Sequence, residues 1–437
     1  MAHKLTFEEI AEFQKDYESK SQNKVAELAV VNNGVQKASL NPASYRQLNR
    51  TFSIEIPTDA VTNQKQSGRC WLFAALNVMR HQFAKKYKAK NFLFSQAYLF
   101  FWDRIERANI FFDEIIETAD QPVDDRTVQS YLRAPDTDGG QWAMAVSLIR
   151  KYGLVPDYAY GESFTANNTS NFNQALNMKL REDGLVLRKL VQEGKDSEVE
   201  VKRKEFLNEV YRMATIAFGE PVKKFDLEYK DDDSKYQLDQ DLTPTDFFKK
   251  YFVDDLDDYV VLFNAPDHEM DKLYALPFED NVVGGTPVQF LNTDIQNLKD
   301  ATIKQLEAGE TIWFGCDVGK SSDRQLGIMA NGMYQTDNLF DIKTTLSKKE
   351  RLLTGASGST HAMTLVGVDV VNGKPRQWKV ENSWGEKVGK NGYFVMGDDW
   401  FNEYLFKVVV KKQYIPEKLV KIWEGPATPV HPWDSMA

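Results

Sequence analysis

The sequence predicts an α+β protein in which helices and strands occupy different stretches of the chain. Between about residues 70 and 152, apolar residues recur at helical spacing. After about residue 285, short runs rich in β-branched and aromatic residues alternate with turn residues, which is typical of strands. Helices and strands segregated in this way favour an α+β fold over an alternating α/β fold.

The chain has 437 residues, and at roughly 150 residues per domain it is expected to form two or three units. We expect residues 1–60 to form an N-terminal helix and an extended segment, and residues 61–160 to form a helical part. Residues 161–285 are polar and strongly charged. They are expected to be a largely helical insertion, with either subunit contacts or a solvated charged face. Residues 286–420 form the strand-rich part, and the Pro-rich residues 421–437 form an irregular C-terminal arm.

The overall charge disfavours nucleic acid as a partner. The chain has 54 basic and 64 acidic residues, a net charge of −10, whereas affinity for a phosphate backbone comes mostly from Lys and Arg. Only two cysteines are present, which is typical of a reducing compartment. The first residues lack a signal-peptide pattern, and no stretch approaches the roughly 20 apolar residues of a membrane span. We therefore expect a soluble, cytoplasmic protein without membrane contact.

Cys70 stands where a polar, glycine-containing loop meets an apolar helical pattern. A thiol at a helix N-terminus faces unpaired N–H groups and the positive end of the helix dipole. This setting stabilises the thiolate and predicts a lowered pKa for Cys70, in the range of roughly 3.5–7.5. Most free cysteines are nevertheless buried and inert, so the catalytic interpretation requires a base.

One of the five histidines fits the role of that base. His3 and His431 lie near the chain ends, and His268 stands in a polar loop, where we expect a solvated side chain rather than a metal ligand. His81 is on the same predicted helix as the cysteine, about 16 Å away along its axis, which is beyond hydrogen-bonding distance. His361 remains, at a loop of small residues that enters an apolar strand. A histidine at a strand end can also be purely structural.

A predicted hairpin favours the catalytic interpretation of His361. Asn372-Gly373 between two strand patterns is a strong signal for a two-residue turn. With that loop, Asn382 is a diagonal neighbour of His361 on the same face of the sheet. Pro375 leaves the loop length open. A three-residue loop would move Asn382 to the opposite face, and a four-residue loop would keep the face but widen the gap.

These residues together predict acyl transfer to a thiolate, followed by hydrolysis. Asn382 Oδ1 would accept a hydrogen bond from one ring nitrogen of His361 and aim the other nitrogen at Cys70. The side-chain amide of Gln64 and the backbone N–H of Cys70 would stabilise a developing oxyanion. Loss of one such donor typically costs ~10²–10³ in rate. We expect neither a metal nor a cofactor.

The motifs resemble those of the papain-like cysteine peptidases. The residues that carry the resemblance occur in the family's order: Gln64, Cys70-Trp71, His361-Ala362 and Asn382-Ser383-Trp384-Gly385. Gly139 and Gly140 are similar to the glycine pair that lines the family's substrate cleft. The resemblance implies a two-lobe fold, with a helical lobe and a β-barrel-like lobe. It also implies that Gly139, Gly140 and Trp384 contact the substrate, and that Trp384 shields the hydrogen bond between Asn382 and His361.

The sequence differs from secreted papains in two features, and these indicate one branch of the papain-like peptidases. Ser67 stands where secreted papains have a disulfide cysteine, and the charged insertion lengthens the chain between nucleophile and base. In both features the sequence resembles the bleomycin hydrolase family and, within it, the bacterial aminopeptidase C branch. That resemblance implies a cytoplasmic homo-hexamer with sites facing an internal cavity. It also implies that the C-terminal arm enters the cleft, where the carboxylate of Ala437 pairs with the free α-ammonium of a peptide substrate.

The sequence therefore predicts a cysteine aminopeptidase of broad specificity that removes N-terminal residues from peptides through a thioester acyl-enzyme. A cysteine endopeptidase of the same class is an alternative. A nucleic-acid-binding regulatory relative is another, although the acidic net charge argues against it.

Overall fold

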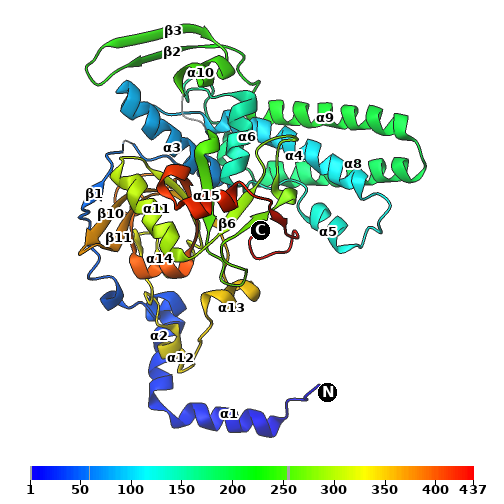
Figure 1. Cartoon of the computed structure of the whole chain (residues 1–437). Coiled ribbons are helices and arrows are strands. Elements are labelled where there is room, and N and C mark those ends of the chain that lie inside the picture. The colour runs from blue at the N-terminus through cyan, green and yellow to red at the C-terminus, as the bar shows by residue number, and fades with distance from the viewer. Residues whose placement is uncertain (1, 59, 253–255) are drawn as a thin grey trace.

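The computed structural model describes residues 2–58, 60–252 and 256–437, so residues 1, 59 and 253–255 of the predicted N-terminal segment and insertion lie outside the described residues. Helices dominate the chain as far as residue 251 (Figure 1). They are α1 (Phe7–Ser19), α2 (Ser21–Ala38), α3 (Cys70–Tyr87), α4 (Gln96–Glu117), α5 (Arg126–Arg133), α6 (Trp142–Tyr152), α7 (Phe164–Asn167), α8 (Ser170–Gln192), α9 (Asp196–Phe218) and α10 (Pro244–Tyr251). The rest of the chain adds α11 (Ile295–Glu307), α12 (Thr336–Phe340), α13 (Lys348–Leu353), α14 (Asp398–Tyr404) and α15 (Glu417–Trp423).

The described strands form one large mixed sheet and one separate hairpin. The large sheet has the order β14-β5-β6-β4-β13-β7-β10-β11-β12-β9-β8, and β1 pairs with β10. Its strands are β1 (Ile54–Glu55), β4 (Tyr259–Phe263), β5 (Lys272–Ala275), β6 (Gln289–Asn292), β7 (Ile312–Cys316), β8 (Ser322–Asp323), β9 (Ile328–Met329), β10 (His361–Val371), β11 (Lys374–Glu381), β12 (Tyr393–Gly397), β13 (Leu405–Lys411) and β14 (Thr428–Pro429). The hairpin pairs β2 (Phe225–Lys230) with β3 (Tyr236–Leu242). Helices that precede most of the strands confirm the predicted α+β class.

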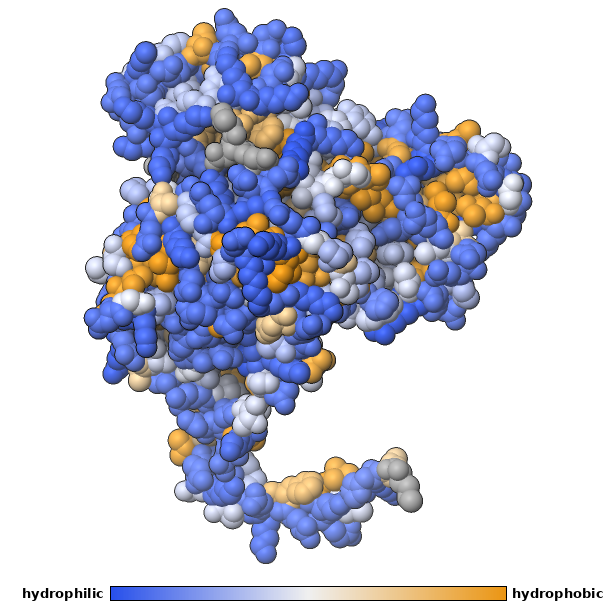
Figure 2. Space-filling view, viewed as in Figure 1, coloured by the Kyte–Doolittle hydropathy of each residue, from blue (hydrophilic) through white to orange (hydrophobic). Residues whose placement is uncertain are grey.

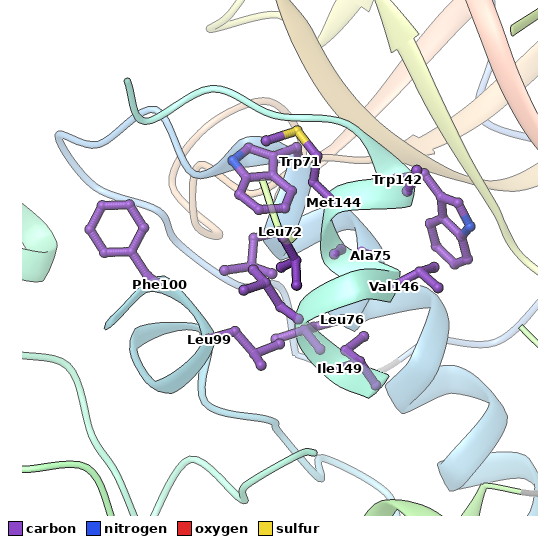
Figure 3. Packing of buried hydrophobic residues seen from close by; sticks show 14 of the residues in the cluster. Trp71, Leu72, Ala75, Leu76, Leu99, Phe100, Trp142, Met144, Val146 and Ile149 are labelled. Carbon is purple, nitrogen blue, oxygen red and sulfur yellow. The ribbon is translucent and has the colours of Figure 1, made fainter. Parts of the chain in front are cut away.

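Helix α3 is the centre of the helical side. Nearly every residue of its first three turns is buried, which is typical of a helix that runs through a core. Figure 3 shows side chains of α3 packed against those of α4 and α6, among them Trp71, Leu72, Leu76, Leu99, Phe100, Val146 and Ile149. Full burial of each large apolar side chain contributes roughly 1.5–3 kcal/mol relative to exposure. This packing fixes the start of α3, where Cys70 lies.

A second apolar cluster lies between the large sheet and the helices that cover it. Leu298 of α11, Trp378 of β11 and Phe401 of α14 belong to it, and the rings of Trp378 and Phe401 stack with centroids 4.8 Å apart. The molecule thus has one core on its helical side and one on its sheet side. None of the described helices is long and apolar enough to cross a membrane.

The N-terminal segment departs from the predicted single helix. Lys20 has φ −110° and ψ 106°, which is extended backbone, and it separates α1 from α2. Neither helix has a buried residue. Figure 1 shows that both helices extend away from the body of the molecule. Neither helix therefore packs into a core of this chain that would favour one continuous helix.

The predicted insertion, residues 161–285, is mostly helical as far as Phe218, where α9 ends, and among its described residues only the short α-helix α10 follows. Figure 1 shows α8 and α9 running side by side away from the sheet. The chain then forms the β2–β3 hairpin, and β4 and β5 join the large sheet. Every residue of β4 is buried. A short buried apolar run of this kind cannot be assigned to strand or helix from periodicity alone, which is why the sequence did not reveal it.

Candidate active site

A cavity of about 760 Å³ lies where the helical side meets the large sheet. Its walls include Cys70 from α3, His361 from β10 and Lys407 from β13. Most of the residues predicted to form the site line it: Gln64, Cys70, Gly139, Gly140, His361 and Ala437. The other two, Asn382 and Trp384, contact the imidazole of His361. The fold therefore gathers residues from both ends of the chain around one cleft.

Cys70 is the first residue of α3, as the sequence predicts. The residue is 9% exposed, and its Sγ–H donates to Gly68 O over 3.8 Å. Burial is the largest influence on this thiol and raises the pKa of Cys70. The backbone N–H groups of Ala362, Trp71 and Cys70 itself act in the opposite direction. The predicted lowering of the Cys70 pKa is therefore wrong, because burial outweighs the helix N-terminus.

His361 begins β10 and is oriented by Asn382. Its Nε2 donates to Asn382 Oδ1 over 3.0 Å, and the same oxygen accepts the Ser383 backbone N–H over 2.8 Å. The two bonds aim the amide oxygen at the ring, so Nδ1 is the nitrogen left to receive a proton. Burial lowers the pKa of His361 to about 4; the bond to Asn382 opposes this effect, and the charge of Arg324 adds to it. The imidazole is therefore a neutral base near pH 7.

The thiol and the imidazole face the same cavity although their elements are far apart in sequence. The backbone N–H of Ala362, which follows His361, points at the Cys70 sulfur. Trp313 of β7 donates its Nε1–H to Trp71 O over 3.0 Å and ties α3 to the sheet. The first turn of α3 and the first residues of β10 consequently face the same cavity.

The hairpin that positions Asn382 has the predicted two-residue loop. Asn372 and Gly373 have φ of 52° and 75°, the left-handed backbone that a type I′ turn requires. Thr364 pairs with Glu381, as this loop length predicts. Two register shifts lie between the turn and that pair, one on each strand, and they cancel. Asn382 therefore follows β11 on the face that carries the histidine.

Gln64 is fixed by bonds on both sides of its amide. Its Nε2 donates to Ser67 O over 2.6 Å, and its Oε1 accepts from Ser383 Oγ over 2.8 Å. The backbone N–H of Gln64 also donates to Ser383 O over 2.9 Å. A primary amide has two N–H groups, so one remains for a ligand in the cavity. The segment that orients the imidazole thus also orients the predicted oxyanion donor.

The two glycines of the cleft wall differ in what surrounds them. A Cβ on Gly140 would lie 2.6 Å from the ring of Trp71, whereas a Cβ on Gly139 would meet no atom within 4 Å. Gly140 is therefore required by packing, because no larger residue fits beside the indole. Gly139 instead borders open space in the cavity, where the backbone of a substrate can approach.

Trp384 lies behind the imidazole rather than in the cavity wall. Its ring centroid is 4.8 Å from that of His361, and the Arg324 guanidinium lies 4.1 Å from the indole centroid. Trp384 is absent from the residues that line the cavity. The expected substrate contact of Trp384 therefore finds no support in this geometry, whereas the expected shielding of the His361–Asn382 hydrogen bond does.

Two contacts that the sequence did not indicate hold the loop before Cys70. Asp138 Oδ2 accepts the Gly68 N–H over 2.9 Å, and its carbonyl accepts the Trp71 Nε1–H over 2.7 Å. Arg69 is fully buried and binds both carboxylate oxygens of Glu162, at 2.9 and 2.8 Å. Paired forks of this kind are strong and directional. No pattern in the sequence could reveal partners 70 and 93 residues away.

Lys407 is a buried cation that lines the cavity and was also missed. Its Nζ donates to Gln141 Oε1 over 2.6 Å and lies 4.6 Å from the ring centroid of Phe290. Burial lowers the pKa of Lys407 to about 8, while Glu279 and Cys70 oppose this effect. The charge of Lys407 in turn favours the thiolate of Cys70. A lysine inside the apolar strand Leu405–Lys411 was the available signal in the sequence.

A buried thiol, an imidazole oriented by an amide, and a fixed side-chain amide around one cleft are the parts of a cysteine peptidase site. Residues 4–437 match the Peptidase C1-like family. The chain belongs to this family.

Several aminopeptidases match along the whole chain. Aminopeptidase E of Lactobacillus helveticus is 54% identical over 438 residues, covering 100% of both chains. Aminopeptidase C of Lactobacillus delbrueckii subsp. lactis is 45% identical and covers 100% of this chain and 98% of its own. A crystal structure of PepW from Lactobacillus rhamnosis superimposes with a TM-score of 0.97 at 47% identity, covering 100% of this chain and 99% of that one. These matches confirm the predicted resemblance and the papain-like α+β fold.

Proposed function

We propose that this protein is a cysteine aminopeptidase that removes N-terminal residues from peptides with broad specificity, through a thioester acyl-enzyme. One observation carries the proposal: the Cys70 thiol and the Asn382-oriented His361 share a cavity with the last residue of the chain, Ala437. Relatives named aminopeptidases support substrates with a free N-terminus.

The first step transfers the substrate's acyl group to sulfur. The Sγ–H proton of Cys70 moves to Nδ1 of His361 as the sulfur attacks the scissile carbonyl carbon. In the resting site burial favours the neutral thiol and the neutral imidazole. The proton therefore moves as the bond forms, and the adjacent charges of thiolate and imidazolium then stabilise each other. Asn382 accepts the Nε2–H throughout and stabilises the imidazolium.

The oxyanion of the tetrahedral intermediate faces two donors, Gln64 Nε2–H and the Cys70 backbone N–H. The C–N bond breaks as His361 gives its proton to the leaving amine. Water then attacks the thioester and yields a proton to His361, and the C–S bond breaks as the thiol is restored. Donors fixed in advance, like the doubly bonded amide of Gln64, cost no reorganisation during reaction.

The C-terminal arm supplies the preference for free N-termini in this proposal. Ala437 lines the same cavity as Cys70, so its carboxylate can pair with an α-ammonium group. The arm blocks the part of the cleft that residues beyond the substrate's N-terminus would occupy. Gly139 and Gly140 form the wall beside the substrate backbone.

The proposed assembly is a homo-hexamer in the cytoplasm. Apolar side chains line α1 in Figure 2, and Phe7 of α1 and Val31 of α2 are 88% and 77% exposed. Val201 and Ile216 of α9 are 66% and 81% exposed, which supports subunit contacts in residues 161–285 as well. Both cysteines are free thiols, which suits a reducing compartment.

The decisive experiment replaces the nucleophile. Cys70→Ala is expected to abolish hydrolysis of a free-amine dipeptide coumarin amide while leaving the melting temperature nearly unchanged. Cys316→Ala is the matched control, because Cys316 is the other free thiol and lies in β7. Full activity in Cys70→Ala would reject the proposal.

Two further measurements separate the alternatives. An endopeptidase would cleave the N-acetylated substrate as well as the free-amine form, and alkylation with iodoacetamide would stop both reactions. A nucleic-acid-binding protein would be retained on single-stranded DNA at physiological ionic strength, and retention would fall as salt is raised.

A further inference from the structure

The C-terminal arm follows the edge of the large sheet before it enters the cleft. Thr428 and Pro429 form β14, parallel to β5, and the Val430 N–H donates to Ala275 O over 3.0 Å. A turn then brings the Asp434 N–H to within 2.9 Å of a carbonyl three residues earlier, and Ala437 reaches the cavity. Figure 1 shows the C-terminus between the sheet and the helices near α5.

His268 lies between two carboxylates, one from its own loop and one from the arm. Its Nδ1 is 3.3 Å from Asp267 Oδ2, and its Nε2 is 3.1 Å from Asp434 Oδ2. Only a protonated imidazole donates from both nitrogens, so the two carboxylates together favour the imidazolium. The side chain of His268 is 17% exposed, so the expectation of a solvated loop histidine is wrong.

The carboxylate of Asp267, which lies beside His268, also binds a residue of the arm. Ser435 Oγ donates to Asp267 Oδ2 over 2.5 Å, and Asp434 Oδ1 accepts the Met436 N–H over 2.9 Å. We call Asp267, His268, Asp434 and Ser435 the arm clamp. It fixes the two residues that precede the last apolar side chain, and so it fixes the direction in which the chain end points.

Contacts outside the arm clamp set how far the arm reaches into the cleft, rather than the direction in which the chain end points. Met436 is fully buried in the apolar cluster of the helical side. The Arg126 guanidinium of α5 lies 3.9 Å from the ring centroid of Trp433. The arm is thus attached to the helical side by apolar and cation–π contacts, and to the β4–β5 loop by the charged arm clamp.

We propose that His268 is a positioning residue that holds Asp434, keeps Ala437 in the cavity and thereby makes a free N-terminus necessary for cleavage. This inference rests on the proposed function, in which the arm blocks one part of the cleft. Without the cation of His268, the carboxylates of Asp267 and Asp434 face each other in a partly buried site with no positive charge between them. Their repulsion favours departure of the arm, and the cleft then admits blocked peptides.

The arm clamp also gives the specificity a pH dependence. The carboxylates of Asp267 and Asp434 raise the pKa of His268 to about 9, against the smaller effect of burial. Because this value is above the ordinary 6.5, the clamp is complete below pH 6.5 and is lost as pH rises through about 9. Tyr274 of β5 also faces the ring, at 5.2 Å between centroids. Burial raises the pKa of Tyr274, so that phenol stays neutral over this range.

The test compares kcat/KM for an N-acetylated and a free-amine coumarin amide of the same dipeptide. His268→Leu is expected to raise the acetylated-to-free ratio at least tenfold at pH 7.5. The matched control is Glu269→Gln, which removes the next carboxylate in the loop, a partner of Lys272 alone among the ion pairs of the described residues. Its ratio is expected to equal that of the unaltered protein.

A pH profile guards against a variant that is merely destabilised. The profile uses the N-acetylated substrate alone, because the α-ammonium group of the free-amine substrate itself loses its proton at roughly pH 8. The kcat/KM of the unaltered protein, divided by that of His268→Leu at the same pH, is expected to rise between pH 8 and 10. A quotient that stays constant over this range would overturn the role of His268.

A truncation lacking residues 434–437 separates this inference from the proposed function. If the truncation raises the ratio and His268→Leu does not, the arm is the gate but His268 does not hold it, and the inference fails. If the truncation itself leaves the ratio unchanged, the arm is not the gate and that part of the proposed function fails. A rise in both variants supports the inference.

Discussion

The two sides of the cleft position their reactive groups by different means. On the helical side Cys70 depends on close backbone approach: Gly140 lies against the indole of Trp71, and Gly68 lies against Asp138. On the sheet side His361 depends on strand register, because Asn382 reaches it only if two shifts between β10 and β11 cancel. A change in the packing around Cys70 is therefore expected to have a graded effect on activity. A slip of one residue in the sheet would turn every side chain to the other face.

The two sides are joined at Gln64 and Ser383. The side chain and backbone of Gln64, from the loop before α3, bond to Ser383, which follows β11. The oxyanion donor is consequently positioned by the sheet although it precedes the helix in sequence. Three sets of substitutions test this comparison in turn. They are made at the base His361, at Gln64 in this junction, and at the cleft glycines Gly139 and Gly140.

Of these three sets of substitutions, the largest effect is expected at the base, on the sheet side. His361→Ala removes the only proton acceptor that Asn382 orients, and general acid–base catalysis contributes ~10²–10⁴-fold. We expect kcat to fall by up to ~10⁴-fold with little change in KM, measured on the free-amine substrate. His3→Ala is the control, since His3 lies in the exposed N-terminal segment. A decrease smaller than tenfold in His361→Ala would contradict the assignment.

A smaller effect is expected at the junction. Gln64→Ala removes one oxyanion donor, which typically lowers kcat by ~10²–10³-fold. Gln64→Glu keeps the shape but replaces the donor with an acceptor, so it is expected to be at least as damaging. Steady-state kinetics of both variants against Gln129→Ala, an amide on α5 outside the cavity lining, would check this. Unchanged kcat in Gln64→Ala would show that the backbone N–H of Cys70 is sufficient.

The smallest effects are expected on the helical side, where the two glycines give opposite outcomes. Gly140→Ala places a Cβ against the Trp71 ring and is expected to lower the free energy of unfolding by about 1–3 kcal/mol, as overpacking does. Gly139→Ala meets no neighbour and is expected to change it by less than about 0.5 kcal/mol. It is expected to raise KM instead, because the new methyl group enters the cavity. Urea unfolding and steady-state kinetics separate the two variants, and equal destabilisation would contradict the distinction.

Much of the site could be predicted because its elements are set by neighbouring residues. The helix begins at Cys70 because a polar loop gives way there to an apolar helical pattern. The turn at Asn372 and Gly373 forms because both residues tolerate positive φ. Even so, the sequence did not indicate the two register shifts between β10 and β11, which cancel. The predicted register was correct at Thr364 and Glu381 only because each strand carries one extra residue.

The protonation of the site could not be predicted in the same way. The helix N-terminus at Cys70 is a local feature and suggests a thiolate, but burial depends on what the rest of the chain places around the sulfur. The same holds for Lys407, which is a charged residue in the sequence and a buried cation at the cleft in the fold.

The sequence by itself determined the local elements, such as the start of α3 and the Asn372-Gly373 turn, because backbone preference and apolar spacing act between near neighbours. Only the tertiary structure decided which charges find partners. Arg69 binds Glu162, and His268 binds Asp434 of the arm. Each of these residues could equally be a solvated charge when the sequence alone is considered, because an ion pair depends on distance in space and not on spacing along the chain.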